Sequence, residues 1–207
     1  AIALTGQGIK AVMEQIQPGL HEFDMAALFE YTVRRGGSEK LPFLVTAGGE
    51  NIFAMHYTGD RKTLMDQEFF LIDCGASVGH YCADVTRTFP VNGVFTDRQK
   101  YWYEVCLKVQ ELTIKDLRPG TKRSEVGKDA REYLSGIFCE NGYEAAPDTL
   151  RVFNDTAYAF VGQANHSFGL DAHEIGDDVL LPGMIYTVEP NIFIKKEGIG
   201  LRIEDDI

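Results

Sequence analysis

The chain of 207 residues is short of positive charge, of closely spaced cysteines and of long hydrophobic runs. Its 20 Lys and Arg residues face 31 Asp and Glu residues, which leaves a formal net charge of −11. Because nucleic acids and anionic membrane surfaces attract basic proteins, this balance argues against both as partners. The longest apolar runs are too short to cross a bilayer, and no signal peptide is recognisable.

The four cysteines are scattered along the chain with no CxxC spacing, at Cys74, Cys82, Cys106 and Cys139. This pattern is typical of reduced, mostly buried thiols, and it predicts a cytoplasmic protein. Cys74 and Cys82 flank the turn of an acidic hairpin. We interpret them as free core residues rather than as metal ligands.

Length and composition predict one domain over residues 1–207, or one large domain built of two halves. Apolar residues make up 44% and charged residues 25%, as in an ordinary globular protein. The chain opens inside a helical pattern without an initiator Met, and it stops at Ile207 within a predicted strand. We therefore expect a domain taken from a longer protein, with its last strand truncated.

The pattern predicts two helices followed by β-hairpins, and then the same order again. Helices that end at Pro-Gly, Gly-Gly or Asn-Gly are expected over 5–17, 22–35, 96–117 and 124–139. Strands are expected over 43–46, 53–56, 69–74, 83–89, 158–161, 185–188, 191–194 and 201–204. This repetition predicts an α+β fold in which each half contributes two carboxylates around a pseudo-twofold axis.

In the first half, Asp73 and Asp84 stand on the two strands of a hairpin whose turn is marked by Gly79. Asp73 follows the apolar run Phe-Phe-Leu-Ile, which is typical of a buried strand. Gly75 then permits a bend or a close approach of the backbone. Two carboxylates at one level of a hairpin repel each other and predict a cation. The alternative is an ordinary buried salt bridge, for which Arg87 is a ready partner.

In the second half, Glu189 stands in Thr-Val-Glu-Pro-Asn and Glu204 in Leu-Arg-Ile-Glu-Asp-Asp. Pro190 forces Glu189 into extended geometry and so restricts where its carboxylate points. Arg202 shares a strand face with Glu204, which makes it a candidate partner that orients a ligand carboxylate. The alternatives are a solvated strand-end Glu189 and a surface pair of Arg202 with Glu204 on an edge strand.

His166 and His173 are seven residues apart in Asn-His-Ser-Phe-Gly-Leu-Asp-Ala-His, too far for the short-helix zinc pattern. One can bind a metal while the other faces a substrate. If the five potential ligands converge, their combined acidity requires cations, and two divalent ions in a metallohydrolase are the best explanation. These ligands are Asp73, Asp84, His166, Glu189 and Glu204.

Together, these segments resemble the pita-bread metallopeptidases, which comprise Xaa-Pro aminopeptidases, Xaa-Pro dipeptidases (prolidases) and methionine aminopeptidases. The ligand order Asp, Asp, His, Glu, Glu carries the resemblance, which extends over nearly the whole chain. The stretches ADVTRTFPVNG, HSFGLDAHEIG, LPGMIYTVEPN and RIEDDI are similar to the proline-directed branch, which usually has a separate N-terminal domain. The implied fold has two pseudo-symmetric halves, each with two helices and antiparallel hairpins, around a curved β-sheet.

The resemblance also implies a role for each metal ligand. Asp73 would bind one ion, His166 and Glu189 the other, and Asp84 and Glu204 would bridge both. A carboxylate-rich ligand set favours Mn²⁺, with Co²⁺ or Zn²⁺ as substitutes. A water or hydroxide between the two ions would be the nucleophile.

Three residues receive catalytic roles by the same resemblance. Glu189 would take the proton of the nucleophilic water, and His173 would stabilise the tetrahedral intermediate or shuttle a proton to it. His56 would contact the substrate beyond the scissile bond. The implied activity is a metallo-exopeptidase that removes the N-terminal residue from short peptides, before proline.

One departure concerns specificity. Proline-directed members often carry another His four residues before the ligand His, where this chain has Gly162. Two other functions stay open: a creatinase-like amidinohydrolase that works without metals, and a non-catalytic module that binds peptides or proteins. Retention of all five ligands argues against both. A homodimer is common on this fold, although the sequence reveals no interface.

Overall fold

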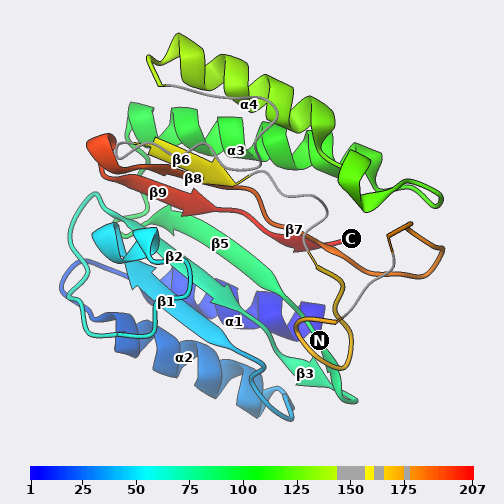
Figure 1. The fold of residues 1–207 in the computed structure, drawn as a ribbon. Coiled ribbons are helices and arrows are strands. Elements are labelled where there is room, and N and C mark those ends of the chain that lie inside the picture. The colour runs from blue at the N-terminus through cyan, green and yellow to red at the C-terminus, as the bar shows by residue number, and fades with distance from the viewer. Residues whose placement is uncertain (144–156, 161–165, 175–177) are drawn as a thin grey trace.

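The computed structural model describes residues 1–143, 157–160, 166–174 and 178–207, which form two similar α+β halves (Figure 1). The first half contains helices α1 (Ile2–Gln15) and α2 (Glu22–Arg35) and a sheet of β1 (Leu44–Gly48), β2 (Phe69–Cys74) and β5 (Val85–Pro90). The second half contains helices α3 (Asp97–Asp116) and α4 (Lys128–Glu140) and a sheet of β6 (Ala157–Phe160), β8 (Asn191–Ile194) and β9 (Ile199–Arg202). Neighbouring strands are antiparallel in both sheets, so the predicted repetition is confirmed.

Shorter elements complete the fold and are distributed around the two sheets. They are the hairpin of β3 (Ser77–Val78) and β4 (Tyr81–Cys82), the pair of β7 (Thr187–Val188) and β10 (Asp205–Asp206), and the 3-10 helices η1 (Gly49–Phe53), η2 (Arg123–Glu125) and η3 (Lys195–Glu197). Within the described ranges, every helix is too short or too polar to cross a lipid bilayer. No disulfide links the cysteines, and three of the four are buried, as predicted.

Local signals explain where the main helices begin. At the start of α2, the backbone N–H of His21 donates to Asp24 Oδ2 at 2.8 Å, which closes a capping box. At the start of α3, Thr96 and Gln99 form the reciprocal pair, with N···O distances of 2.9 and 3.2 Å. The predicted start of this helix at residue 96 is therefore confirmed, because two backbone donors at the helix end are satisfied there.

Strand β2 is buried on both faces, which explains its continuous apolar run. Phe69 and Leu71 belong to the core that contains Trp102 of α3, whereas Phe70 and Ile72 belong to the core beneath α1 and α2. Side chains alternate along a strand, so Asp73 lies on the face of Phe69 and Leu71, away from α1 and α2. The strands thus lie between two pairs of helices (Figure 1).

The two halves join where β5 lies beside β9 (Figure 1). The Thr88 hydroxyl donates to the carbonyl oxygen of Arg202 at 2.9 Å and accepts from the backbone N–H of Arg202 at 3.1 Å. Further along, the backbone N–H of Glu204 donates to the carbonyl oxygen of Thr86 at 3.1 Å. These bonds join the edges of the two sheets, and we call this junction the seam.

The prediction of a strand over 53–56 is wrong. Residues Gly49–Phe53 form η1, and the chain continues through a bend and turn at 54–56 and then without regular structure to residue 62. Gly49 adopts a positive φ of 54°, which ends β1 sharply. Other boundaries shift by a few residues. The predicted helix over 124–139 begins only at Lys128, since Gly127 has a φ of +74°.

Gly75 provides a test of the close approach behind Asp73. A Cβ atom there would lie 1.9 Å from the backbone carbonyl oxygen of Ala83. We expect Gly75→Ala to lower the free energy of unfolding by about 2–3 kcal/mol, because a backbone atom must move. Gly136→Ala is the control, since its Cβ meets nothing within 4 Å on the exposed face of α4. It should stabilise the protein by about 0.5–1 kcal/mol. Equal effects in urea unfolding would contradict this explanation.

Candidate metal centre

The four predicted carboxylate ligands lie at one end of the seam. Asp73 is opposite Thr86 in the pairing of β2 with β5, and Asp84 directly precedes β5. The pairing of β7 with β10 joins Val188 to Asp205, which brings Glu189 beside Glu204. Each half therefore contributes two acids to the same place, although the pairs are far apart in the sequence.

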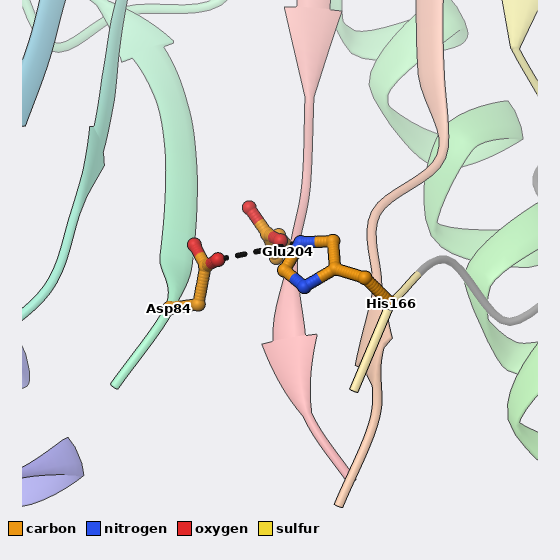
Figure 2. A group of neighbouring side chains, drawn as sticks. All are labelled: Asp84, His166 and Glu204. Carbon is orange, nitrogen blue, oxygen red and sulfur yellow. Dashed lines mark ion pairs between the residues drawn. The ribbon is translucent and has the colours of Figure 1, made fainter. Parts of the chain in front are cut away.

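His166 completes the cluster, as Figure 2 shows for three of its members. One ligand atom each from Asp84, His166 and Glu204 lies within 4.8 Å of the others. His166 Nε2 is 3.5 Å from Asp84 Oδ2 and 3.5 Å from Glu189 Oε1. The imidazole thus connects a carboxylate of the first half to one of the second.

Thr86 and Arg202 form hydrogen bonds with two of the ligand carboxylates. The Thr86 hydroxyl lies 2.9 Å from Asp73 Oδ1 and 2.6 Å from Glu204 Oε2. Arg202 Nε donates to the same hydroxyl at 2.9 Å, and a terminal nitrogen of Arg202 donates to Asp73 Oδ2. All five predicted ligands therefore converge. Thr86 links Asp73 to Glu204, and His166 lies beside Asp84 and Glu189.

Arg202 does not form the surface pair that was one alternative from the sequence. It is only 2% exposed, and its guanidinium contacts Asp73 and Thr86. Arg87, the possible salt-bridge partner of a buried Asp, instead pairs with Asp205 at 2.5 Å.

The crowded carboxylates strongly affect one another. Burial, followed by the charges of Asp73 and Glu189, raises the pKa of Asp84 to about 9. Burial and the neighbouring acids likewise raise the pKa of Glu204 well above its ordinary value. The pKa of His166 falls to about 4, because burial and the nearby His173 disfavour the imidazolium. At neutral pH His166 is therefore a neutral ring, the form that binds metals.

This donor set fits divalent cations. It offers four carboxylates and one neutral imidazole from separate segments, which are linked to one another through His166 and Thr86. Among the described residues, Arg202 is the arginine that pairs with a ligand carboxylate, that of Asp73, whereas Arg87 contacts only the backbone carbonyl of a ligand, that of Glu204. Divalent cations would offset the remaining negative charge, whereas burial of these carboxylates without counter-charge is costly.

The catalytic histidines predicted from the sequence line the same open cavity of about 860 Å³ as the ligands. The ring of His173 stacks on that of His166, with a centroid distance of 4.0 Å and an interplanar angle of 29°. His56 reaches the cavity from the loop that follows η1. Gly162, which bears on specificity, lies outside the described residues.

Some residues of the site were not predicted from the sequence. Thr86 was missed, although its alternation with Asp84 and Thr88 on one face of β5 was a usable signal. Thr187 was also missed; its hydroxyl donates to Glu189 Oε1 at 3.4 Å. The residues that line the rest of the cavity share no sequence motif, because only their position in the fold brings them together. They are Pro42, Phe43, Leu44, Val45, Met55, Thr58, Asp171 and Ala172.

Arg202 should be essential to the stability of the metal-free protein. Arg202→Leu leaves Asp73 buried without its partner, so we expect a loss of about 3–5 kcal/mol in the free energy of unfolding. The control is Lys10→Leu, which removes an exposed pair with Glu14 at 3.7 Å and should cost less than about 0.5 kcal/mol. Urea unfolding of metal-stripped protein measures both. A loss below 1 kcal/mol for Arg202→Leu would show that Asp73 does not depend on it.

Comparison with known proteins identifies the relatives of this site. The Xaa-Pro aminopeptidase of Escherichia coli is 34% identical over 220 residues, which cover 99% of this chain and 50% of that protein. The Xaa-Pro dipeptidase of Pyrococcus furiosus is 31% identical, covering 100% of this chain and 56% of that protein. The chain thus spans about half the length of the curated relatives it matches.

Solved structures agree with this relationship. Pseudomonas aeruginosa aminopeptidase PepP matches with a TM-score of 0.87 and 31% identity, covering 100% of this chain and 51% of that one. The predicted pita-bread fold, with two pseudo-symmetric halves around a curved sheet, is confirmed. Metallopeptidase family M24 matches residues 1–207, and the chain therefore belongs to that family.

Proposed function

We propose that the protein is a dinuclear metal-dependent exopeptidase that removes the N-terminal residue from short peptides, with preference for Xaa-Pro. The observation that carries the proposal is the convergence of all five potential ligands on one side of an open cavity. The names of the relatives, Xaa-Pro aminopeptidase and Xaa-Pro dipeptidase, support the same reaction.

The family resemblance implies how the ligands would divide between two ions. Asp73 would hold one ion, His166 and Glu189 the other, and Asp84 and Glu204 would bridge them. Hard oxygen donors in excess over nitrogen favour Mn²⁺, and Co²⁺ or Zn²⁺ could replace it. Such a pair of cations, when bound, lowers the pKa of water and polarises a carbonyl oxygen.

The protein's own residues then handle protons and orient the peptide. Glu189 would accept a proton from the attacking water. The Thr187 hydroxyl, which donates to Glu189 Oε1 at 3.4 Å, would hold this carboxylate in place. His173, exposed on the cavity side and stacked on His166, would donate a hydrogen bond to the oxygen that develops charge. His56, which lines the same cavity, would contact the peptide beyond the scissile bond.

The cavity suits a short peptide with a free amino group. Its acidic lining includes Asp171, which is exposed and can attract an ammonium group. Its apolar lining comes from Pro42, Phe43, Leu44 and Met55, which can cover hydrophobic side chains. A creatinase-like reaction and a binding module both leave the convergence of five ligands unexplained, so neither is favoured.

Calorimetric titration of metal-stripped protein with Mn²⁺ tests the centre directly. We expect two ions per chain for the wild type and fewer than two for Glu204→Ala, because that substitution removes a bridging ligand. The same samples should be assayed with Xaa-Pro and Xaa-Ala peptides. Two tightly bound ions in Glu204→Ala would refute the bridging role, and equal cleavage of both peptides would refute the preference for proline.

His173 should be needed for turnover and not for metal binding. We expect His173→Ala to bind two Mn²⁺ ions and to lose at least about 100-fold in kcat, the usual contribution of a general acid. The control is His80→Asn, on the exposed turn between β3 and β4, where Asn tolerates the positive φ of 69°. Wild-type kcat in His173→Ala would remove this residue from the mechanism.

A further inference from the structure

Glu22, the first residue of α2, is a fully buried carboxylate outside the metal centre. Oε1 accepts hydrogen bonds from the backbone N–H of Gly48 at 2.8 Å and from Asn51 Nδ2 at 2.9 Å. Oε2 accepts from the backbone N–H of Lys62 at 2.9 Å. Charge-assisted bonds of this kind are about twice as strong as neutral ones and offset the cost of burying the charge.

These three donors belong to the two ends and the interior of one loop. Gly48 is the last residue of β1, and Lys62 is the residue at which the chain returns to α2, where its carbonyl accepts from the backbone N–H of Glu22 at 3.1 Å. A second tie, from Thr46 Oγ1 to Asp60 Oδ1 at 2.7 Å, closes the loop beside the first. One carboxylate thus holds both ends of residues 48–62.

The interior of this loop is also tied to Glu22. Burial, followed by the charge of Glu22 and a hydrogen bond to it, raises the pKa of Tyr57. Tyr57 packs against the core that contains Trp102. The loop is therefore anchored at its middle as well as at its ends.

Loop 48–62 forms one wall of the cavity. Met55, His56 and Thr58 line the cavity from this loop, whereas the metal ligands come from the seam. His56 is exposed, and in the part of the chain that the structure describes no hydrogen bond holds its ring. The backbone of the loop therefore decides where His56 lies.

We propose that Glu22 is a positioning residue, whose carboxylate closes loop 48–62 and so sets His56 and Met55 against the peptide. The inference rests on the proposed peptidase function, since it assigns the loop a substrate. It differs from a purely structural role, because Glu22 then acts on substrate binding through His56 and leaves the metal centre unchanged.

Glu22→Gln tests the proposal in the full chain loaded with Mn²⁺. Gln keeps the shape, but its amide nitrogen is a donor that must face another donor, so at least one bond to the loop is lost. We expect KM for an Xaa-Pro peptide to rise about 10-fold, kcat to stay within about 3-fold, and two Mn²⁺ ions to bind. Unchanged KM would overturn the proposal, as would a loss confined to kcat.

The matched control is Glu197→Gln, on η3 at the far end of the hairpin of β8 and β9. Glu197 also accepts three kinds of donor, from Arg98, Trp102 and Tyr143, at 2.5 to 3.2 Å. Glu197→Gln should lower the free energy of unfolding without raising KM. An equal rise of KM in both variants would show a general structural effect and overturn the proposal.

A double-mutant cycle shows whether Glu22 acts through His56. In a His56→Ala background, Glu22→Gln should raise KM by less than about 3-fold, because the group that it positions is already absent. Full additivity would overturn the proposal. If Glu22→Gln does not fold, Asn51→Ala replaces it: removal of one of the donors should raise KM about 3-fold, and wild-type KM would count against the clamp.

Hydrogen exchange separates this inference from the proposed function. In Glu22→Gln without peptide, the amides of Gly48 and Lys62 should exchange at least about 10-fold faster than in the wild type. Unchanged exchange would show that Glu22 does not close the loop. A wild-type protein that cleaves no peptide would contradict the proposed function, and faster exchange in the variant would still establish the clamp.

Discussion

Repulsion among buried carboxylates at the seam is the constraint on which this structure depends. Asp73 and Asp84 come from one half and Glu189 and Glu204 from the other, and the bonds between β5 and β9 bring them together. Because the seam is buried in surroundings of low polarity, each added charge there raises the free energy of the folded protein. Arg202 offsets part of this cost at Asp73, and divalent cations are the counter-charge that the remaining ligands suit.

The duplicated architecture explains why the cost is tolerated. Each half has its own helix pair, and the core beside α3 and α4 also takes in Phe69 and Leu71 of the first half, so the hydrophobic stabilisation is spread along both sides of the sheet. The third strand of each half lies at the seam, where β5 meets β9 in antiparallel register through Thr86 and Thr88. Neither half alone contains a complete ligand set, because the site exists only where the two sheets meet.

Local signals in the sequence were sufficient for much of the fold. Helix α2 has the predicted bounds, β2 and β8 coincide with the predicted ranges, and Thr96 caps α3. The segment around Phe53 misled because the short apolar run Ile52-Phe53-Ala54-Met55 is also compatible with a 3-10 turn. There the deciding bonds come from Glu22, distant in sequence. Hydrogen bonds between residues far apart in the chain produce no periodic pattern in a single sequence.

The site shows the same division between local and long-range information. The ligands stand in recognisable segments, and their order alone carries the family resemblance. Thr86 and Glu22 have no such segment, because a buried polar residue acquires its role from partners such as Arg202 or Lys62 elsewhere in the chain. Their importance becomes visible only when hydrogen bonds can be counted.

The two walls of the cavity are therefore held by different devices. The ligand wall depends on the seam, where displacement of one strand would separate all four carboxylates. The wall that contains Met55, His56 and Thr58 depends on loop 48–62 and its attachment to Glu22. Because these attachments share no residue, substitutions in the loop can alter which peptide is bound while the ligand geometry is preserved. A fold with this separation can keep one chemistry and vary its substrates, since the residues that contact the peptide are not those that hold the ions together.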